Sequence, residues 1–153
     1  MGKWRNGSGT LTVVPGPRPG AHRPGPGAGA REITLRIAAS YRARAKGLLG
    51  VDGVDGALLI TPCGSVHTFR MRFGIDVAYL DREFNVLAVR TMRPGRLGLP
   101  RPRARHVLEA EAGAMAGWGL RPGSRVRISA DPPGEASAPG DTSAPGEASA
   151  PGR

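Results

Sequence analysis

The stretch Ile75-Asp76-Val77-Ala78-Tyr79-Leu80-Asp81-Arg82-Glu83-Phe84-Asn85-Val86-Leu87-Ala88-Val89 decides the fold class. Two mainly apolar runs flank the polar residues Asp81-Arg82-Glu83. A short polar loop between two runs rich in β-branched and aromatic residues is typical of a β-hairpin. The sequence therefore predicts paired strands over residues 75–80 and 84–89.

Further strands are predicted on both sides of this hairpin. Ile33, Leu35 and Ile37 alternate with polar residues, which is the pattern of a strand with one buried face. Other short apolar runs predict strands over residues 57–61, 66–71, 106–110 and 125–128. This set predicts an all-β fold with one short helix, a compact antiparallel β-sandwich that is jelly-roll-like, or a barrel.

One main helix is predicted. Ser40 is a suitable N-cap for a helix over residues 41–49, which Gly50 and Gly53 would end. A helical turn or two is also predicted within residues 112–118. Strands and helices alternate too sparsely for a nucleotide-binding α/β sheet.

The composition divides the chain into three parts. Residues 1–30 are rich in Gly, Pro and Arg, and residues 132–153 repeat a Gly/Ala/Ser/Pro hexapeptide. Such segments bury little apolar surface, so both are predicted to be disordered tails. Residues 31–131 are predicted to form a single β-rich domain.

Charge and cysteine content bound the class of protein. The net charge is +10, and residues 31–131 carry 17 Lys and Arg against 9 Asp and Glu. Phosphates and nucleic acid are attracted to such a surface, but the aromatic content of 5% leaves few stacking platforms for single strands. A single cysteine and no signal-like or membrane-spanning apolar run predict a cytoplasmic protein. No motif predicts a cofactor.

The segment from Thr61 to Asp76 holds the candidate chemistry. Cys63 and His67 are candidates for a nucleophile and its base, with Asp76 orienting the imidazole. The favoured alternative is structural, with Cys63 packed as a small hydrophobe and His67 hydrogen-bonded to a neighbour. Side chains that can ligate a metal are also present, but their spacing matches no metal motif, so no metal site is predicted. The residues concerned are Cys63, His67, Asp76, His106 and Glu109.

Arginines suggest a second kind of site. Arg70 and Arg72 alternate with apolar residues, and with Arg44 they are candidates for binding a phosphate or carboxylate. Asp76 must pair with a cation or accept backbone donors if it is buried. The ligand-binding candidates are therefore Arg44, Arg70, Met71, Arg72 and Asp76.

The ordered set of segments resembles the family known as domain of unknown function 192. The resemblance rests on Arg44-Ala45-Lys46-Gly47-Leu48-Leu49-Gly50, on Phe69-Arg70-Met71-Arg72 before Ile75-Asp76, on Tyr79-Leu80-Asp81-Arg82, and on Val107-Leu108-Glu109-Ala110 before Leu120-Arg121-Pro122-Gly123. It implies a small β-sandwich with a short helix, and it implies no known activity. The Pro62–His67 stretch lies outside the general family pattern, so a mechanism using Cys63 would belong to a subgroup.

The leading functional hypothesis is a non-enzymatic module that binds a small anionic ligand or a protein partner. A small enzyme using Cys63 and His67 is the alternative. A weak, arginine-driven nucleic-acid binder is a second alternative, which would be strongly salt-dependent.

Overall fold

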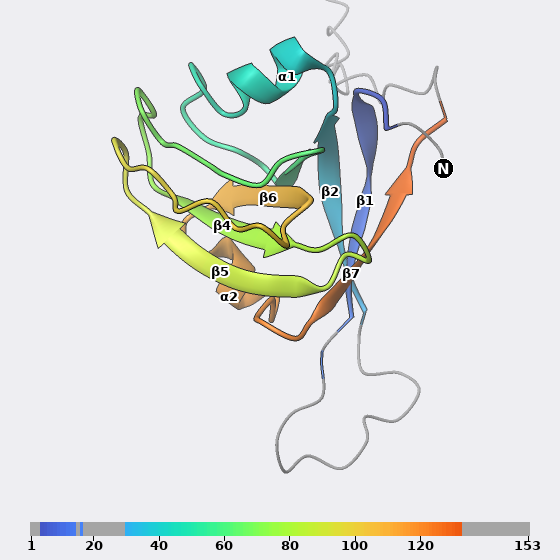
Figure 1. The fold of residues 1–153 in the computed structure, drawn as a ribbon. Coiled ribbons are helices and arrows are strands. Elements are labelled where there is room, and N and C mark those ends of the chain that lie inside the picture. The colour runs from blue at the N-terminus through green and yellow to red at the C-terminus, as the bar shows by residue number, and fades with distance from the viewer. Residues whose placement is uncertain (1–3, 15, 17–29, 133–153) are drawn as a thin grey trace, which may run out of the picture.

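The computed structural model describes residues 4–14, 16 and 30–132. These residues form one seven-stranded sheet that curls into a half-barrel, with two short helices (Figure 1). The strand order is β5-β4-β6-β3-β2-β1-β7. The strands are β1 (Gly7–Val14), β2 (Arg31–Ala38), β3 (Ala57–Ile60), β4 (Ile75–Leu80), β5 (Val86–Met92), β6 (His106–Glu111) and β7 (Arg125–Ala130), and the helices are α1 (Tyr41–Lys46) and α2 (Ala114–Gly117).

The all-β class and the hairpin are confirmed. β4 and β5 pair antiparallel, and the carboxylate of Asp81 closes their turn by accepting from the backbone N–H groups of Glu83 and Asn85, both at 2.9 Å. One pairing departs from the antiparallel expectation, because β2 and β3 run parallel. Parallel neighbours need a crossover connection, and the segment containing α1 supplies it.

The two edges of the sheet meet at one end of the half-barrel. Val86 at the start of β5 donates its backbone N–H to Ser124 just before β7, at 2.8 Å, and Val126 donates to Phe84 at 3.0 Å. These bonds close the curl near the β4–β5 turn and leave the rest of both edges apart. The prediction of a sandwich or barrel is thus realised as a single curled sheet.

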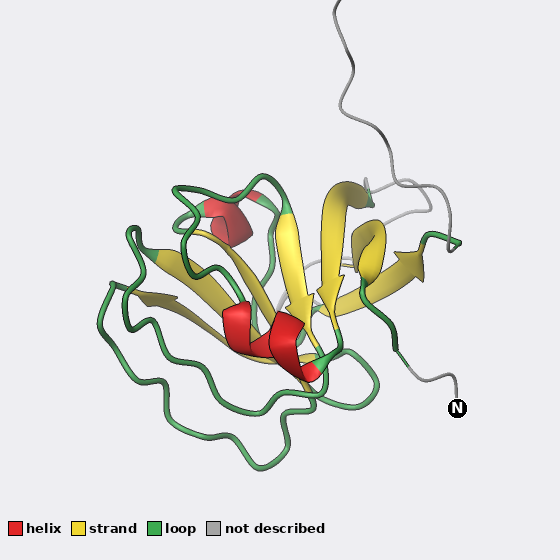
Figure 2. Ribbon diagram, turned by 90° about the horizontal axis from the view of Figure 1, so that it is seen from above, coloured by secondary structure: helices red, strands yellow, loops and turns green. Residues whose placement is uncertain are grey.

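Apolar side chains are buried on both faces of this sheet, since alternate residues of a strand point to opposite sides. Leu59 and Leu108 belong to a cluster that includes Met115 of α2, whereas Leu58 and Val107 belong to a cluster beneath α1 and its neighbouring loops. Figure 2 shows α1 and α2 against different parts of the sheet. The central strands β4 and β6 are therefore covered on both sides.

The predicted N-terminal tail of residues 1–30 is corrected over residues 7–14. β1 pairs with both β2 and β7, and it buries Leu11 and Val13. A Cβ at Gly9 would clash with the backbone of Ser129, so glycine permits the close pairing with β7. This strand was not predicted because residues 1–30 are rich in Gly, Pro and Arg. The tail predicted over 132–153 lies outside the described residues, apart from residue 132.

The strand predicted over residues 66–71 is wrong. This segment is a loop with one isolated bridge, between His67 and Leu97, and Arg70 has a φ of 61°. Thr68 holds the loop, because its buried hydroxyl donates to Arg93 O at 2.6 Å and accepts from Arg96 N at 2.8 Å. The alternation of faces predicted for this segment therefore does not exist.

The N-cap of α1 is confirmed, and its end is corrected. The Ser40 hydroxyl accepts from Ala43 N at 3.2 Å. The helix ends at Lys46 because Gly47 adopts a φ of 47°. The sequence predicted a later end, at Gly50 and Gly53. The residues after Gly47 therefore turn toward the sheet, and Leu48 is buried there.

Candidate functional site

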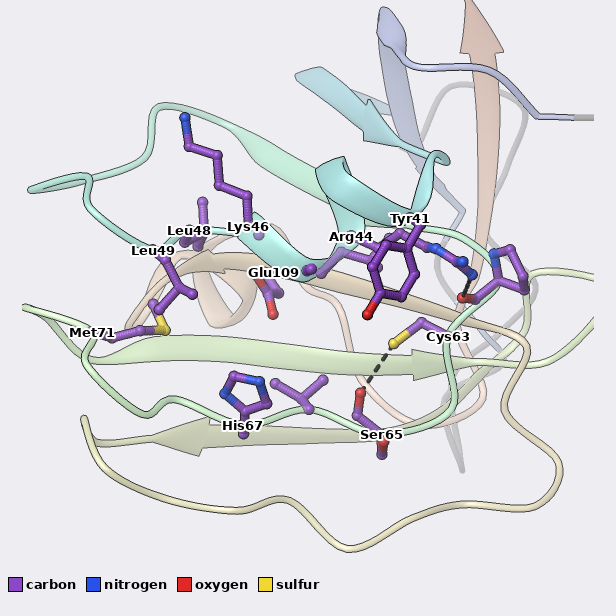
Figure 3. Close-up of a pocket in the computed structure, with 15 residues that line it drawn as sticks. Tyr41, Arg44, Lys46, Leu48, Leu49, Cys63, Ser65, His67, Met71 and Glu109 are labelled. Atoms are coloured by element: carbon purple, nitrogen blue, oxygen red, sulfur yellow. Dashed lines mark hydrogen bonds between the residues drawn. The ribbon is translucent and has the colours of Figure 1, made fainter.

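A pocket of about 250 Å³ lies between α1, the loop after β3 and the face of β6 (Figure 3). We call it the Glu109 pocket. Its volume lies just below the range of about 300–1,000 Å³ that is usual for small-molecule sites. It is lined by Tyr41, Arg44, Ala45, Lys46, Gly47, Leu48, Leu49, Ile60, Pro62, Cys63, Ser65, Val66, His67, Met71 and Glu109.

Glu109 is the buried carboxyl group of this pocket. It is 4% exposed, and its cross-strand neighbours on β3 and β4 are Leu58 and Val77, which offer it no hydrogen bond. Its Oε2 atom is fully buried and has no hydrogen-bond partner among the described residues. Burial in these apolar surroundings raises the pKa of Glu109 to about 7. The group therefore exists as both acid and carboxylate near neutral pH.

Gly47 explains how the end of α1 lies so close to this carboxyl group. A Cβ at position 47 would be 3.7 Å from Glu109 Oε2, and the backbone there has a positive φ. The turn after α1 thus passes directly beside the carboxyl group. A larger residue at position 47 would be strained by this backbone conformation, whereas its Cβ would meet Oε2 at an ordinary van der Waals distance.

Arg44 brings a cation to the same pocket. Its Nη1 donates to the carbonyl of Pro62 at 2.9 Å, which holds the guanidinium along the pocket wall. Its Nε is buried and has no hydrogen-bond partner among the described residues. Arg44 and Glu109 therefore line the same pocket although they are 65 positions apart in the sequence.

Cys63 lines the pocket as a neutral thiol. Burial raises its pKa, and the charge of Glu109 raises it further. Its Sγ donates to Ser65 O at 3.0 Å, so the bonded acceptor is a backbone carbonyl. A nucleophilic cysteine needs a lowered pKa, which this environment does not provide.

The three residues of the predicted triad are not brought together. His67 lines the pocket, but its ring is exposed and stacks on Phe69 with centroids 5.3 Å apart. Asp76 lies on the central strand β4 and does not line the pocket. Its carboxylate accepts from Thr91 Oγ1 at 2.6 Å and from the backbone N–H groups of Gly113 and Met115 at 2.9 and 3.1 Å. It holds the start of α2 by accepting from backbone donors, which is one of the two arrangements expected of a buried carboxylate at this position.

The three candidate arginines are also separated. Arg44 and Met71 line the pocket, whereas Arg70 and Arg72 do not. Arg72 is exposed and pairs with Asp52 at 2.6 Å. The arginines are separated because residues 66–71 form a loop, in which alternate side chains do not share a face as they would in a strand.

Metal-ligating side chains do not gather within residues 4–14, 16 and 30–132, where no three of them could hold one ion. His106 does not line the pocket; its Nδ1 bonds the Thr61 hydroxyl at 2.7 Å, and its ring stacks on that of Phe84 with centroids 4.3 Å apart. Trp4 packs against the same pair, which corrects its assignment to a tail.

Sequence reasoning considered Glu109 only as a metal ligand. A signal was present, because Glu109 interrupts the apolar run Val107-Leu108-Glu109-Ala110. A carboxyl group within an apolar strand is costly if the strand is covered on both faces. The sequence does not show which strands are covered, so this cost became visible only with the sheet order. Tyr41 and Lys46 were also missed as lining residues.

The fold and site define a small half-barrel β-domain with a pocket beneath a short helix, and a buried carboxyl group in the wall of that pocket. The family model DUF192, described as Uncharacterized ACR, matches residues 25–128, and the chain belongs to this family. The resemblance expected from the sequence is thereby confirmed.

Relatives of the chain are named UPF0127 proteins. The UPF0127 protein PH1112 of Pyrococcus horikoshii is 37% identical over 87 residues, which span 54% of this chain and 76% of that protein. The UPF0127 protein PYRAB11210 of Pyrococcus abyssi is 32% identical over 87 residues, spanning 54% of this chain and 74% of that protein. A solved structure of a protein of unknown function from Novosphingobium aromaticivorans shares the fold, with a TM-score of 0.61, 17% identity, and 77% and 83% of the two chains covered.

Three of the four sequence segments that carry the family resemblance meet at the Glu109 pocket. The first contributes Arg44 and the turn after α1, the second contributes Met71, and the last contributes Glu109. The third segment, 79–82, lies in the β4–β5 hairpin instead. The family pattern therefore converges on this cavity from distant parts of the chain.

Proposed function

We propose that this protein is a non-enzymatic module that binds a small ligand in the Glu109 pocket. The observation that carries the proposal is the buried carboxyl group of Glu109 in the wall of this pocket, whose Oε2 atom has no hydrogen-bond partner among the described residues. An unsatisfied buried polar group costs about 1–3 kcal/mol, and a ligand that donated a hydrogen bond to this carboxyl group would offset that cost. Apolar walls from Leu48, Ile60 and Met71 supply the rest of the contact surface.

The enzyme alternative receives less support from the site. Cys63 is a neutral thiol bonded to a backbone carbonyl, and Asp76 serves α2. His67 is left without the orienting carboxylate that the triad hypothesis assigns to it. The geometry therefore favours binding over thiol chemistry.

The charged residues that line the pocket differ from those expected for an anion site. An anion was expected to meet three arginines, but Arg70 and Arg72 lie outside the lining. Among the described residues, Arg44 and Lys46 bring positive charge to the lining and Glu109 brings the opposing charge when ionised.

Nucleic-acid binding through scattered arginines remains the second alternative, and its affinity would fall steeply with salt.

A blocked pocket tests the proposal. Ala45 is exposed and lines the pocket, so Ala45→Trp would fill its mouth with little disturbance of the core. Arg42 lies on the same helix, is exposed and does not line the pocket, so Arg42→Trp is the matched control. Both variants and the parent are screened with a set of small soluble fragments by backbone amide NMR shifts.

We expect fragment-induced shifts to gather around Leu48, Met71 and Glu109, to be lost in Ala45→Trp and to persist in Arg42→Trp. Shifts that gather on another surface would contradict the proposal. The same conclusion would follow if Ala45→Trp bound every fragment as well as the parent does.

A further inference from the structure

We propose that the loops of residues 61–74 and 93–105 form a surface that binds an anionic phospholipid bilayer. We call it the Leu97 surface. The proposal concerns side chains outside the lining of the Glu109 pocket and does not depend on ligand binding there. The Leu97 surface consists of the exposed residues Phe69, Leu97 and Leu99 and the exposed arginines Arg70, Arg93 and Arg96.

Backbone hydrogen bonds join the two loops, which run side by side (Figure 1). Gly98 donates its N–H to Val66 O at 2.7 Å. Thr68 donates its N–H to Arg96 O at 2.7 Å, and its carbonyl accepts from Gly95 N at 2.8 Å. The two loops therefore present one continuous surface.

Three large apolar side chains are exposed on this surface. Phe69, Leu97 and Leu99 are 47%, 68% and 77% exposed, and they are three of the four exposed large hydrophobic residues in the described part of the chain. Leu97 is paired in an isolated bridge with His67, and the ring of His67 stacks on that of Phe69 with centroids 5.3 Å apart. The exposed apolar residues are therefore grouped, and a grouped apolar patch with a polar rim is typical of an interaction site.

Gly98 explains why both leucines face outward. A Cβ at position 98 would be 2.5 Å from the Tyr79 hydroxyl and 3.0 Å from Val66 O, so this position faces the interior and only glycine fits there. Leu97 and Leu99 flank this inward-facing position, and both are exposed. The close contact at Gly98 thus holds the two leucines at the surface.

Positive charge surrounds the apolar residues. The two loops together contain seven arginines and no Asp or Glu. Arg72 is paired with Asp52 of a neighbouring loop. Arg70, Arg93 and Arg96 are exposed and form no ion pair with another described residue. These three guanidinium groups are therefore free to bind anions.

An anionic bilayer complements both parts of this surface. Lipid phosphates accept hydrogen bonds from guanidinium groups, and the boundary between head groups and acyl chains accepts apolar side chains. Nucleic acid also offers phosphates, but its phosphate backbone has no apolar phase to receive two leucines. Phe69, Leu97 and Leu99 line neither the Glu109 pocket nor the pocket between residues 62–65 and 100–105, so they project outward and form no groove for a partner's side chains.

Vesicle co-sedimentation of the full chain tests the proposal. Binding is measured in about 0.1 M salt with phosphatidylcholine vesicles and with vesicles that also contain about 30% phosphatidylserine. We expect the chain to bind the anionic vesicles about tenfold or more tightly than the neutral ones, because each arginine at the surface contributes about 1 kcal/mol.

Two double variants assign the contacts. Leu97→Ser with Leu99→Ser should weaken binding to anionic vesicles about tenfold, because the apolar contact is lost. Arg93→Gln with Arg96→Gln should weaken it about thirtyfold. The matched control is Arg82→Gln with Arg127→Gln, which removes the same charge from the exposed residues of the β4–β5 turn and β7 and should change binding about twofold at most.

Fluorescence gives an independent readout of insertion. Leu99→Trp places an indole in the proposed contact, so brominated acyl chains should quench this variant more than the parent. The parent retains Trp4 and Trp118, which are half-buried outside these loops.

Four outcomes would overturn the proposal. They are no binding to anionic vesicles, unchanged binding in the leucine variant, an equal loss in the arginine variant and its control, and quenching of Leu99→Trp no greater than that of the parent. A random DNA duplex provides the comparison with nucleic acid. If the duplex binds more tightly than the vesicles, and the arginine variant but not the leucine variant weakens that binding, the surface is a nucleic-acid interface instead.

Discussion

Replacing Glu109 by glutamine should stabilise the protein, and the gain should grow with pH. The side chains have nearly the same shape, but glutamine cannot ionise. In the folded protein the pKa of Glu109 is raised from 4.5 to about 7 by burial. The folded state therefore holds a proton that the unfolded state has already lost between these two values.

The sign and size of the change in stability follow from this difference in bound protons. Stability falls as pH rises wherever the folded state binds more protons than the unfolded state. The penalty is absent well below pH 4.5, grows through the window up to about 7, and then levels off. At 1.36 kcal/mol per pKa unit, its full value is about 3 kcal/mol. Glu109→Gln removes this penalty.

Urea denaturation followed by tryptophan fluorescence would measure the effect at several pH values. We expect the stability difference between Glu109→Gln and the parent to grow by about 2–3 kcal/mol between pH 5 and pH 8. Other titrating groups at the pocket, namely Tyr41, Lys46, Cys63 and His67, are present in both proteins and largely cancel in the difference. Glu111→Gln is the control, because Glu111 is the exposed carboxyl group of the same strand.

Parallel stability curves for Glu109→Gln and the parent across this pH range would refute the reasoning. They would mean that water or a neighbouring cation reaches Glu109 and keeps its pKa near the ordinary value. An equal pH-dependent gain in Glu111→Gln would also refute it, because the effect would then come from the general charge of the protein.

Other predictions concern the residues around this site. Asp76→Ala should cost about 3 kcal/mol of unfolding free energy, since it leaves the buried backbone N–H of Met115, the N–H of Gly113 and the Thr91 hydroxyl without their acceptor, and it should leave fragment binding in the Glu109 pocket unchanged because Asp76 does not line it. Thr68→Val should cost about 1–3 kcal/mol by urea denaturation, while Thr68→Ser should retain most of the stability; equal losses in both would assign the effect to packing alone. Alkylation of Cys63 by iodoacetamide should be slow at neutral pH, with a midpoint above the ordinary thiol pKa of 9.0, and a midpoint below 8 would revive the nucleophile hypothesis. Deleting residues 1–14 should prevent folding because β1 separates β2 from β7, whereas deleting residues 132–153 should leave the melting temperature unchanged, as judged by circular dichroism.

The sequence was sufficient for most strands, because their apolar patterns are local. The β4–β5 hairpin is encoded by two apolar runs and a polar turn, and the N-cap Ser40 by a single side chain. β1 was missed because a Gly- and Pro-rich composition surrounds it, and its stability comes from pairing with β2 and with the distant β7. The local pattern of residues 66–71 favoured a strand, but Thr68 bonds to Arg93 and Arg96 override it.

The site was less predictable than the fold. Arg44 and Met71 were correctly proposed as neighbours of a pocket, whereas Arg70, Arg72 and Asp76 were not brought to it. The importance of Glu109 depends on three facts that are not local, namely a central strand, apolar neighbours across it and a covering turn at Gly47. The sequence contains each of these residues but does not show that they lie close together in the fold.

The pairing of β1 with β7 has a consequence for how the chain is made. A chain emerges from the ribosome N-terminal part first, so β1 emerges before the other six strands, and one of its two partner strands, β7, is the last of the seven to be synthesised. Until residue 130 has emerged, one long edge of β1 has no partner and the curl cannot close. An unpaired strand edge is a template for association with other chains. The unpaired edge of β1 is therefore open to such association until β7 has emerged and paired with it.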